Sequence, residues 1–119
     1  MPDVPPATIT PLVVPEIVTL PAEIDIGNAE RTGRELRAAF RPGVTVVIAD
    51  LTRTSFADSS AMRALLEADA TAAASRDELR LVIPPGPVLR ALTITGLDQL
   101  LRIYPSLDAA LSGRTPPGP

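Results

Sequence analysis

Residues 44–51 (VTVVIADL) form an almost continuously apolar and β-branched run, which restricts the fold more than any other feature of the chain. A strand with one face in water alternates apolar and polar residues, whereas a strand without such alternation is covered on both faces. Residues 79–83 form a second run of this kind, which ends at the proline-rich residues 84–87. The chain is therefore expected to contain a mainly parallel sheet with both faces buried.

The segment between residues 28 and 40 has the spacing of a helix. Its small and apolar side chains recur at intervals that place them on one helical face. This face comprises Ala29, Gly33, Leu36 and Phe40. Asn28 is the expected N-cap of the helix, and Pro42-Gly43 is expected to end it.

Three further helices are expected. The first begins at Asp58-Ser59-Ser60 and continues to about residue 75. The next covers residues 88–95 and stops at Gly96, and the last covers residues 105–111 with Gly113 as its cap. A strand at residues 100–103 separates these two helices. The buried stripe of the helix that begins at Asp58 is predicted to contain Met62, Leu65, Leu66, Ala70 and Ala73.

Residues 9–14 and 16–20 are two short β-prone runs separated by Pro15, which predicts an antiparallel pair at a sheet edge. Strands and helices then alternate, and this order predicts parallel strands joined by right-handed crossovers. The predicted fold is α/β, with a mixed, mostly parallel five-stranded sheet and four helices. The domain is expected to span residues 8–112, between a flexible Pro-rich N-terminal tail at 1–7 and a flexible C-terminal tail at 113–119.

The composition excludes several kinds of chemistry. All 11 basic residues are arginine, and the chain contains no lysine, histidine or cysteine. The chain therefore lacks Ser-His-Asp and Cys-His catalytic groups, thiolate zinc sites and the lysine of a phosphate-binding loop. Carboxylates and hydroxyls are the reactive groups that remain, and we expect neither an enzyme nor a bound cofactor.

Charge and hydropathy restrict the possible partners. The net charge is −3, the arginines are scattered singly, and the chain has only three aromatic residues, so nucleic acid is not an expected partner. No apolar run approaches the roughly 20 residues that span a bilayer. Residues 1–15 carry no positive side chain and are interrupted by prolines, unlike a signal or transit peptide. We expect a cytoplasmic protein without membrane contacts.

Polar side chains concentrate directly after the most apolar strand, in residues 52–60 (TRTSFADSS). In open α/β sheets, ligands bind beyond the carboxyl ends of the strands, where helix N-termini present free amide groups. Phe56 is expected to pack beneath this loop, and Ser59 and Ser60 are expected to be exposed. The residue types alone leave a cap and a functional site both open, because Ser or Asp at a helix start is usually a cap. Asp50 is expected to order the loop.

Three segments resemble the STAS domains of anti-sigma factor antagonists. In residues 46–68, as in that family, a hydrophobic strand ends in Asp-Leu, and Phe-X-Asp-Ser-Ser and a helix follow. Residues 20–29 (LPAEIDIGNA) resemble the Gly-Glu-Leu-Asp turn of the family. Residues 93–97 and 103–105 resemble its third helix and last strand, so the resemblance covers residues 15–111 in the family's order.

The resemblance implies a single STAS domain that binds an anti-sigma factor serine kinase and so controls sigma-factor-dependent transcription. It implies that the kinase phosphorylates Ser59, that a metal-dependent serine phosphatase reverses this, and that Asp25 lies beside the serine. We expect a monomer or a weak homodimer. The predicted docking face comprises Asp25, Asn28, Thr54, Asp58, Ser60, Met62 and Arg63.

The chain departs from the family pattern at two places. Family members usually follow the two serines with Gly-Leu-Gly, whereas this chain has Ala61-Met62-Arg63, and Ala22 replaces the glycine of the acidic turn. Arg63 has two interpretations, either a partner for a phosphate or an acidic protein, or a solvated surface residue. Two other functions also remain open, namely a STAS scaffold that is never phosphorylated and a STAS domain that senses a small ligand.

Overall fold

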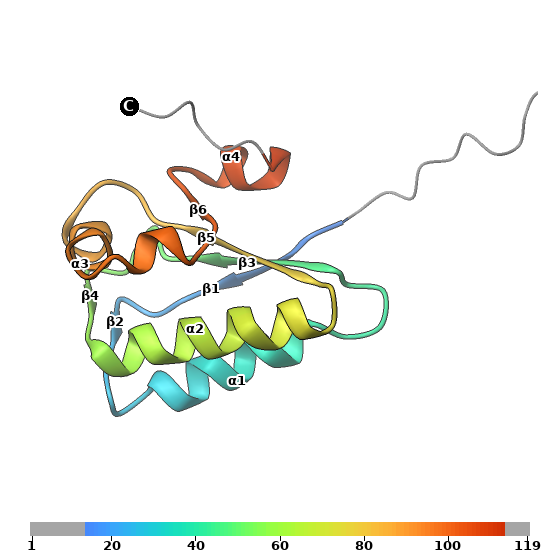
Figure 1. The fold of residues 1–119 in the computed structure, drawn as a ribbon, viewed down its shortest axis with the longest axis horizontal. Coiled ribbons are helices and arrows are strands. Elements are labelled where there is room, and N and C mark those ends of the chain that lie inside the picture. Colours follow the sequence, from blue (N-terminus) through green and yellow to red (C-terminus); the bar gives the residue numbers. More distant parts are fainter. Residues whose placement is uncertain (1–13, 114–119) are drawn as a thin grey trace, which may run out of the picture.

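The computed structural model describes residues 14–113 of the chain, and within this range one or two strands precede each helix (Figure 1). The four predicted helices and the α/β architecture are confirmed. The elements, in chain order, are β1 (Glu16–Thr19), β2 (Glu23–Ile24), α1 (Ala29–Ala39), β3 (Val46–Asp50), β4 (Phe56–Ala57), α2 (Ser59–Ala74), β5 (Glu78–Val82), α3 (Pro87–Thr95), the 3₁₀ turn η2 (Leu97–Gln99), β6 (Ile103–Tyr104) and α4 (Leu107–Ser112).

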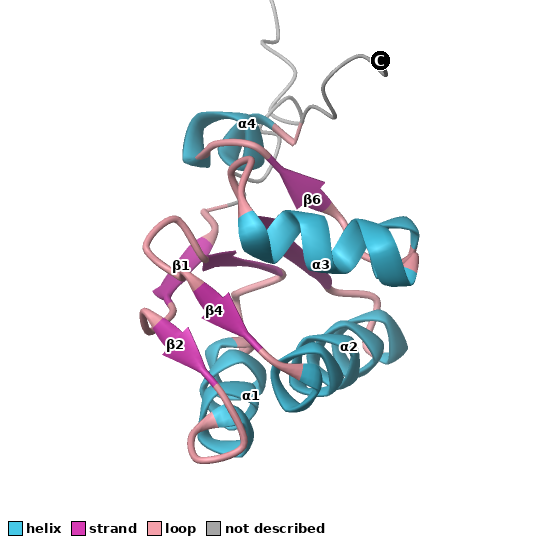
Figure 2. Cartoon of the chain, turned by 90° about the vertical axis from the view of Figure 1, so that its left-hand side faces the viewer, coloured by secondary structure: helices cyan, strands magenta, loops and turns pink. Residues whose placement is uncertain are grey.

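The main sheet has four strands in the order β1-β3-β5-β6, and all of its strand pairs are parallel. Helices α1 and α2 lie against one face of this sheet and α4 lies against the other (Figures 1 and 2). Helix α3 lies across the end at which the parallel strands finish, on the left of Figure 1. The N-termini of α1 and α2 reach the same end, so the loops after β1 and β3 meet there.

Strand β3 is buried on both faces, as the apolar run at residues 44–51 predicts. Val47 and Ala49 belong to the larger core, which also contains Leu36 of α1, Leu65 of α2 and Leu92 of α3. The other face of β3 belongs to a smaller core beneath α4, which contains Val46, Ile48, Val82, Tyr104 and Ala110. Burial on both sides removes the need for polar residues in this strand, because neither face meets water.

The buried stripe of α2 differs from the prediction. Met62 and Leu65 are buried and Leu66 partly so, but Ala70 and Ala73 are exposed. Small residues that face α1 take their place, because α1 and α2 approach each other closely at Gly33 of α1. A Cβ atom added to Gly33 would lie 3.4 Å from the Cβ of Ala64 in α2. The observed stripe therefore continues through Ala61, Ala64, Ala68 and Ala72.

The strands at the two ends of the chain also differ in detail. The last strand, β6, begins later than expected, because residues 97–99 form the turn η2 before it. Strand β1 pairs in parallel with β3. Its predicted antiparallel partner, residues 9–14, and the two predicted tails fall almost entirely outside the described residues. None of the helices within residues 14–113 combines the length and the apolar character needed to cross a bilayer.

Candidate functional site

Two short parallel strands bring the acidic turn beside the start of α2. Ile24 of β2 pairs with Ala57 of β4, and the N–H of Asp58 donates a 3.1 Å hydrogen bond to the carbonyl of Ile24. Figure 2 shows the two strands side by side at the same end of the molecule. Asp25 and Asp58 each follow the last residue of one of these strands, so their two segments lie side by side at this edge.

Asp58 begins α2 as the sequence predicts. Its Oδ1 accepts hydrogen bonds from the main-chain N–H groups of Ser60, at 2.9 Å, and Ala61, at 3.1 Å. A side-chain cap of this kind stabilises a helix by about 1 kcal/mol, because it satisfies N–H groups that have no partner within the helix. The cap also fixes the direction in which the first residues of α2 point.

Ser59 is the first residue of α2, and its side chain is exposed. Its hydroxyl makes no hydrogen bond with any other described residue, whereas Ser60 is half-buried. The fold therefore does not depend on the Ser59 hydroxyl, and the oxygen is accessible to another molecule.

The acidic turn is held by Asn28 and by Asp25 itself. Asn28 Oδ1 accepts a 2.9 Å bond from the N–H of Asp25, and Asn28 Nδ2 donates at 2.8 Å to the carbonyl of Glu23. Asp25 Oδ1 accepts a 2.9 Å bond from the N–H of Gly27. The prediction that Asn28 caps α1 is therefore wrong as regards its side chain, because both polar atoms of the amide are used within the turn.

Thr54 lies inside the site and not on its surface. Its side chain is only 8% exposed, and its hydroxyl donates a 2.8 Å hydrogen bond to the carbonyl of Pro21. The N–H of Ser55 donates to the carbonyl of Ala22 at 2.8 Å in the same place. These bonds join the two loops, and burial removes Thr54 from the predicted docking face.

Phe56 does not pack beneath the loop, and that prediction is wrong. Phe56 is 52% exposed, while the next residue, Ala57, packs against the core. Successive side chains of a strand point to opposite faces, so burial of Ala57 directs Phe56 outward. The site therefore presents an aromatic surface that the sequence interpretation missed, because β4 has two residues and shows no visible alternation.

The loop that follows β3 is ordered as expected. Asp50 Oδ1 accepts a 2.9 Å hydrogen bond from the N–H of Thr52 and a second one from the Thr52 hydroxyl. The N–H of Thr54 then donates to the carbonyl of Leu51 at 3.0 Å. Asp50 is thus a structural carboxylate, as the sequence analysis predicts.

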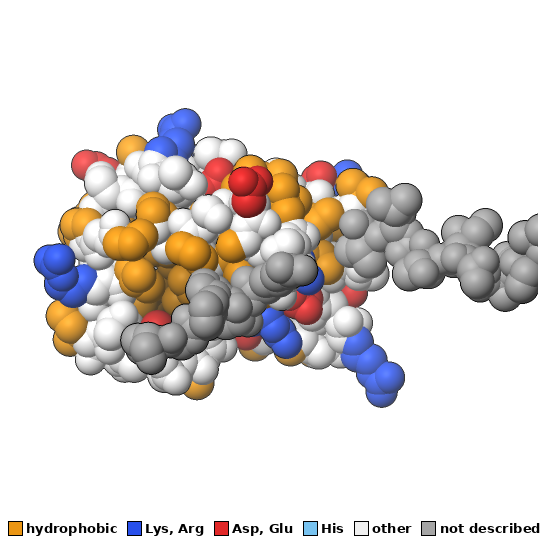
Figure 3. Space-filling view, turned by 90° about the horizontal axis from the view of Figure 1, so that it is seen from above, with side chains coloured by type: hydrophobic (Ala, Val, Ile, Leu, Met, Phe, Trp, Pro, Cys, Tyr) orange, Lys and Arg blue, Asp and Glu red, His pale blue; other side chains and the backbone are white. Residues whose placement is uncertain are grey.

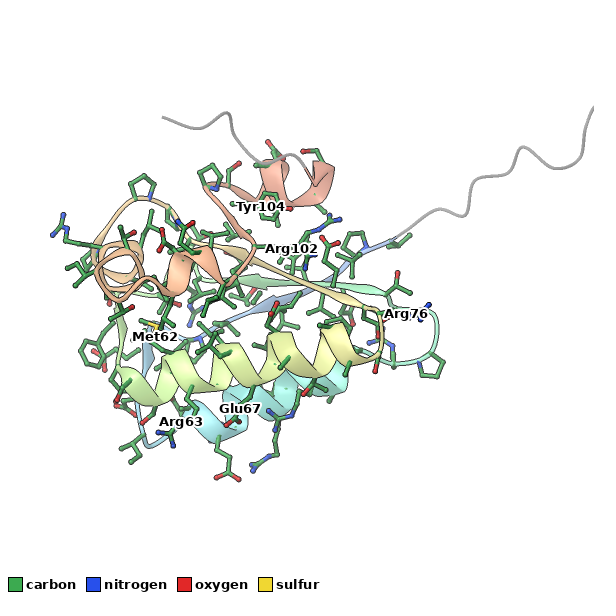
Figure 4. The ribbon with its side chains drawn as sticks, viewed as in Figure 1. Met62, Arg63, Glu67, Arg76, Arg102 and Tyr104 are labelled. Carbon is green, nitrogen blue, oxygen red and sulfur yellow. The ribbon has the colours of Figure 1, made fainter. Side chains whose placement is uncertain are left out.

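A hollow of about 410 Å³ lies between the first turns of α2 and helix α3. Its floor is mostly apolar, and in Figure 4 Met62 points from α2 toward α3. We call it the α2–α3 hollow. Its lining includes Ser59, Met62, Arg63 and Leu66 of α2, Ala91 of α3 and Leu97 of the following turn. The contributions of Ala91 and Leu97 were missed, because no local pattern shows that α3 packs beside the start of α2.

Apolar side chains are also exposed near this end of the molecule. Ile94, on α3, is 77% exposed, and Leu100, which follows the turn η2, is 63% exposed. Figure 3 shows apolar side chains gathered over the part of the molecule where α3 lies. Contiguous apolar surface of this kind is typical of a protein-binding face.

The structure thus brings the predicted residues other than Thr54 to one edge of the domain. Main-chain bonds, the cap and the Asn28 amide fix this edge without using the Ser59 hydroxyl. Such an arrangement can present a flat, polar surface beside an apolar hollow. The residues at this edge are Asp25, Asn28, Asp58, Ser59, Ser60, Met62 and Arg63.

Comparison with known proteins finds a matching protein family and solved structures with a similar fold. A family model described as the STAS domain matches residues 5–110. No curated protein matches the chain in sequence.

Solved structures share the fold at low identity. A sulfate transporter family protein from Wolinella succinogenes is 24% identical with a TM-score of 0.74, over 93% of this chain and 94% of that one. An anti-sigma factor antagonist from Mycobacterium paratuberculosis is 24% identical with a TM-score of 0.68, over 82% of each chain. The Bacillus cell fate determinant SpoIIAA in its phosphorylated form is 22% identical with a TM-score of 0.62, over 88% of this chain and 96% of that one.

Proposed function

The chain belongs to the STAS domain family, and from this premise we propose that it is an anti-sigma factor antagonist whose binding is controlled by phosphate on Ser59. Its partner in this proposal is an anti-sigma factor serine kinase, and a metal-dependent serine phosphatase restores the binding form. The observation that carries the proposal is the exposed, unbonded hydroxyl of Ser59 at the first residue of α2. The neighbours described as an antagonist and as phosphorylated SpoIIAA support it.

The proposed docking face combines the acidic edge with the α2–α3 hollow. Phe56 and Ile94 supply exposed apolar surface at its border, and exposed aromatic side chains are frequent centres of binding energy. Thr54 is excluded because it is buried and lines no part of the hollow, whereas Met62, which is equally buried, forms part of the hollow's lining. The face comprises Asp25, Asn28, Asp58, Ser60, Met62 and Arg63 around Ser59.

Phosphorylation would act on the partner and not on the fold. A phosphate adds about −1.5 to −2 charges, and negative charge is favoured at a helix N-terminus, so α2 stays folded. Asp58 and Asp25 already make this edge acidic. A dianion covered by a flat interface that fitted a hydroxyl would be desolvated, and a loss of about 3 kcal/mol weakens binding more than a hundredfold.

The test uses the complete chain and the purified anti-sigma factor kinases of the source genome. We expect one kinase to bind the chain and, with Mg-ATP, to place a single phosphate on Ser59, located by mass spectrometry. Ser59→Asp should lower the affinity at least about a hundredfold with an unchanged circular dichroism spectrum. Ser75→Asp, at the other end of α2, is the matched control and should bind normally. Normal binding by Ser59→Asp would contradict the proposal.

A second function is favoured by one comparison. Of the three neighbours described above, the sulfate transporter family protein has the highest TM-score and matches the largest share of this chain. This supports a STAS domain that serves as a scaffold or senses a small ligand in the α2–α3 hollow, without phosphorylation. Kinase treatment that leaves the chain unmodified, together with a retained ligand in native mass spectrometry, would favour this alternative.

The proposal includes no catalytic step by the chain itself. We place the protein in the cytoplasm, because its proposed partners are a kinase and a phosphatase that act on the same exposed serine. We also propose that it is a monomer or a weak homodimer. Size-exclusion chromatography with light scattering, over a range of protein concentrations, tests the oligomeric state.

A further inference from the structure

Arg63 is the only arginine of α2, and it lies one helical turn beyond Ser59. Residues four apart on a helix are neighbours, with about 5–6 Å between their Cβ atoms. Both side chains are exposed and both line the α2–α3 hollow. Within residues 14–113, the Arg63 guanidinium has no ion pair and no hydrogen bond, so it is available to a new anion.

Three main-chain N–H groups in the first turn of α2 are already in use. Asp58 accepts hydrogen bonds from the N–H groups of Ser60 and Ala61, and the N–H of Met62 donates to the carbonyl of Asp58. A phosphate on Ser59 would therefore find these donors occupied and would lie next to the Asp58 carboxylate. A cationic side chain on the same helical face would offset this repulsion.

We propose that Arg63 is the internal counter-ion for a phosphate on Ser59, an inference that rests on the phosphorylation proposed above. The planar guanidinium can donate two parallel hydrogen bonds to two phosphate oxygens. The order is the favourable one, with the acidic group N-terminal to the basic group at i,i+4. Glu67, four residues beyond Arg63, has the reverse order and forms no ion pair with it.

The ion pair between Arg63 and a phosphate on Ser59 would alter the docking face. Because Ser59 and Arg63 both line the α2–α3 hollow, their ion pair holds the phosphate at the rim of that hollow. The phosphate would then occupy the border of the apolar surface and would also remove the free positive charge of Arg63 from a partner's reach. One modification would thus change both the shape and the charge of the docking face.

The test installs phosphoserine at position 59 during synthesis of the complete chain, so that no kinase is needed. Phosphorus NMR then follows the second ionisation of the phosphate as the pH is raised. We expect Arg63→Gln to move the titration midpoint to higher pH by about half a pH unit, because the cation favours the dianion. Arg63→Lys should restore part of the shift, and the difference should shrink in high salt.

Arg76→Gln is the matched control, because it makes the same charge change beyond the opposite end of α2 (Figure 4). It should leave the midpoint unchanged. Equal midpoints for the wild-type and Arg63→Gln chains, with both chains folded by circular dichroism, would overturn the inference. Since the phosphate is installed chemically, this result is independent of whether a kinase recognises Ser59, which the earlier experiment decides.

Discussion

The hydroxyl of Thr54 donates a 2.8 Å hydrogen bond to the carbonyl of Pro21, and this bond joins two loops that are 33 residues apart in the chain. One loop carries the acidic turn and the other leads to Ser59. Together with the β2–β4 pairing, the bond fixes the relative positions of the two segments that form the candidate site.

Removing this hydroxyl should loosen the connection between the loops. Thr54→Val keeps the shape of the side chain but leaves the Pro21 carbonyl without its partner, which should lower the free energy of unfolding by about 1–2 kcal/mol. Ser55→Ala is the matched control, because its hydroxyl makes only a 3.3 Å contact at an exposed position. Urea unfolding of the two variants measures the difference, and equal stabilities would show that the Thr54 bond is not important.

Substitutions at Asp58 can separate its cap from its charge. Asp58→Ala removes the acceptor for the N–H groups of Ser60 and Ala61 and should destabilise the domain by about 1 kcal/mol. Asp58→Asn keeps an oxygen acceptor and should be nearly as stable as the wild type. If Asp58→Asn is stable but binds the kinase poorly, the negative charge contributes to docking. Equal destabilisation in thermal melts of the two variants would argue against the capping role.

Phe56 should contribute to partner binding and little to stability. The residue is 52% exposed, so Phe56→Ala removes accessible apolar surface at the proposed docking face. We expect the affinity for the kinase to fall about tenfold or more, measured by calorimetry, with little change in melting temperature. Leu111→Ala, at a 43% exposed position on the opposite side of the sheet, is the control and should bind like the wild type. Unchanged affinity for Phe56→Ala would place the interface elsewhere.

The stability of the domain should depend on the ionisation of Asp69. Burial raises the pKa of Asp69 above its ordinary value of 3.8, and Arg102 opposes this effect. Between the unfolded and folded pKa values, the folded chain holds the proton that the unfolded chain has lost. Stability therefore falls as the pH rises through this window, and the full cost of the buried charge is present above it.

Asp69→Asn removes this cost, so it should be more stable than the wild type at pH 7. The difference should shrink as the pH falls and vanish below 3.8, where the carboxyl is neutral in both the folded and the unfolded wild type. Glu67→Gln changes an exposed acid on the same helix and serves as the control (Figure 4). Denaturant unfolding at several pH values gives both curves, and a stabilisation by Asp69→Asn that did not vary with pH would contradict this account.

Features with a local cause could be predicted from the sequence. The run at residues 44–51 predicted a strand buried on both faces, because complete burial excludes polar residues from the first four positions of β3. Asp58 predicted the start of α2, and Gly96 and Gly113 predicted helix ends, which they form with φ values of +78° and +68°. Caps and stops depend on neighbouring residues alone, so they are visible in the chain.

The tertiary structure alone decided how the candidate site is assembled. The β2–β4 pairing, the bond between Thr54 and Pro21 and the contact of α3 with the start of α2 all join distant segments. Strands of two residues are too short to show a period, so neither the outward position of Phe56 nor the engagement of Asn28 in the acidic turn could be foreseen. The sequence determined which elements form, because their causes are local, and long-range packing determined which side chains remain free to meet a partner.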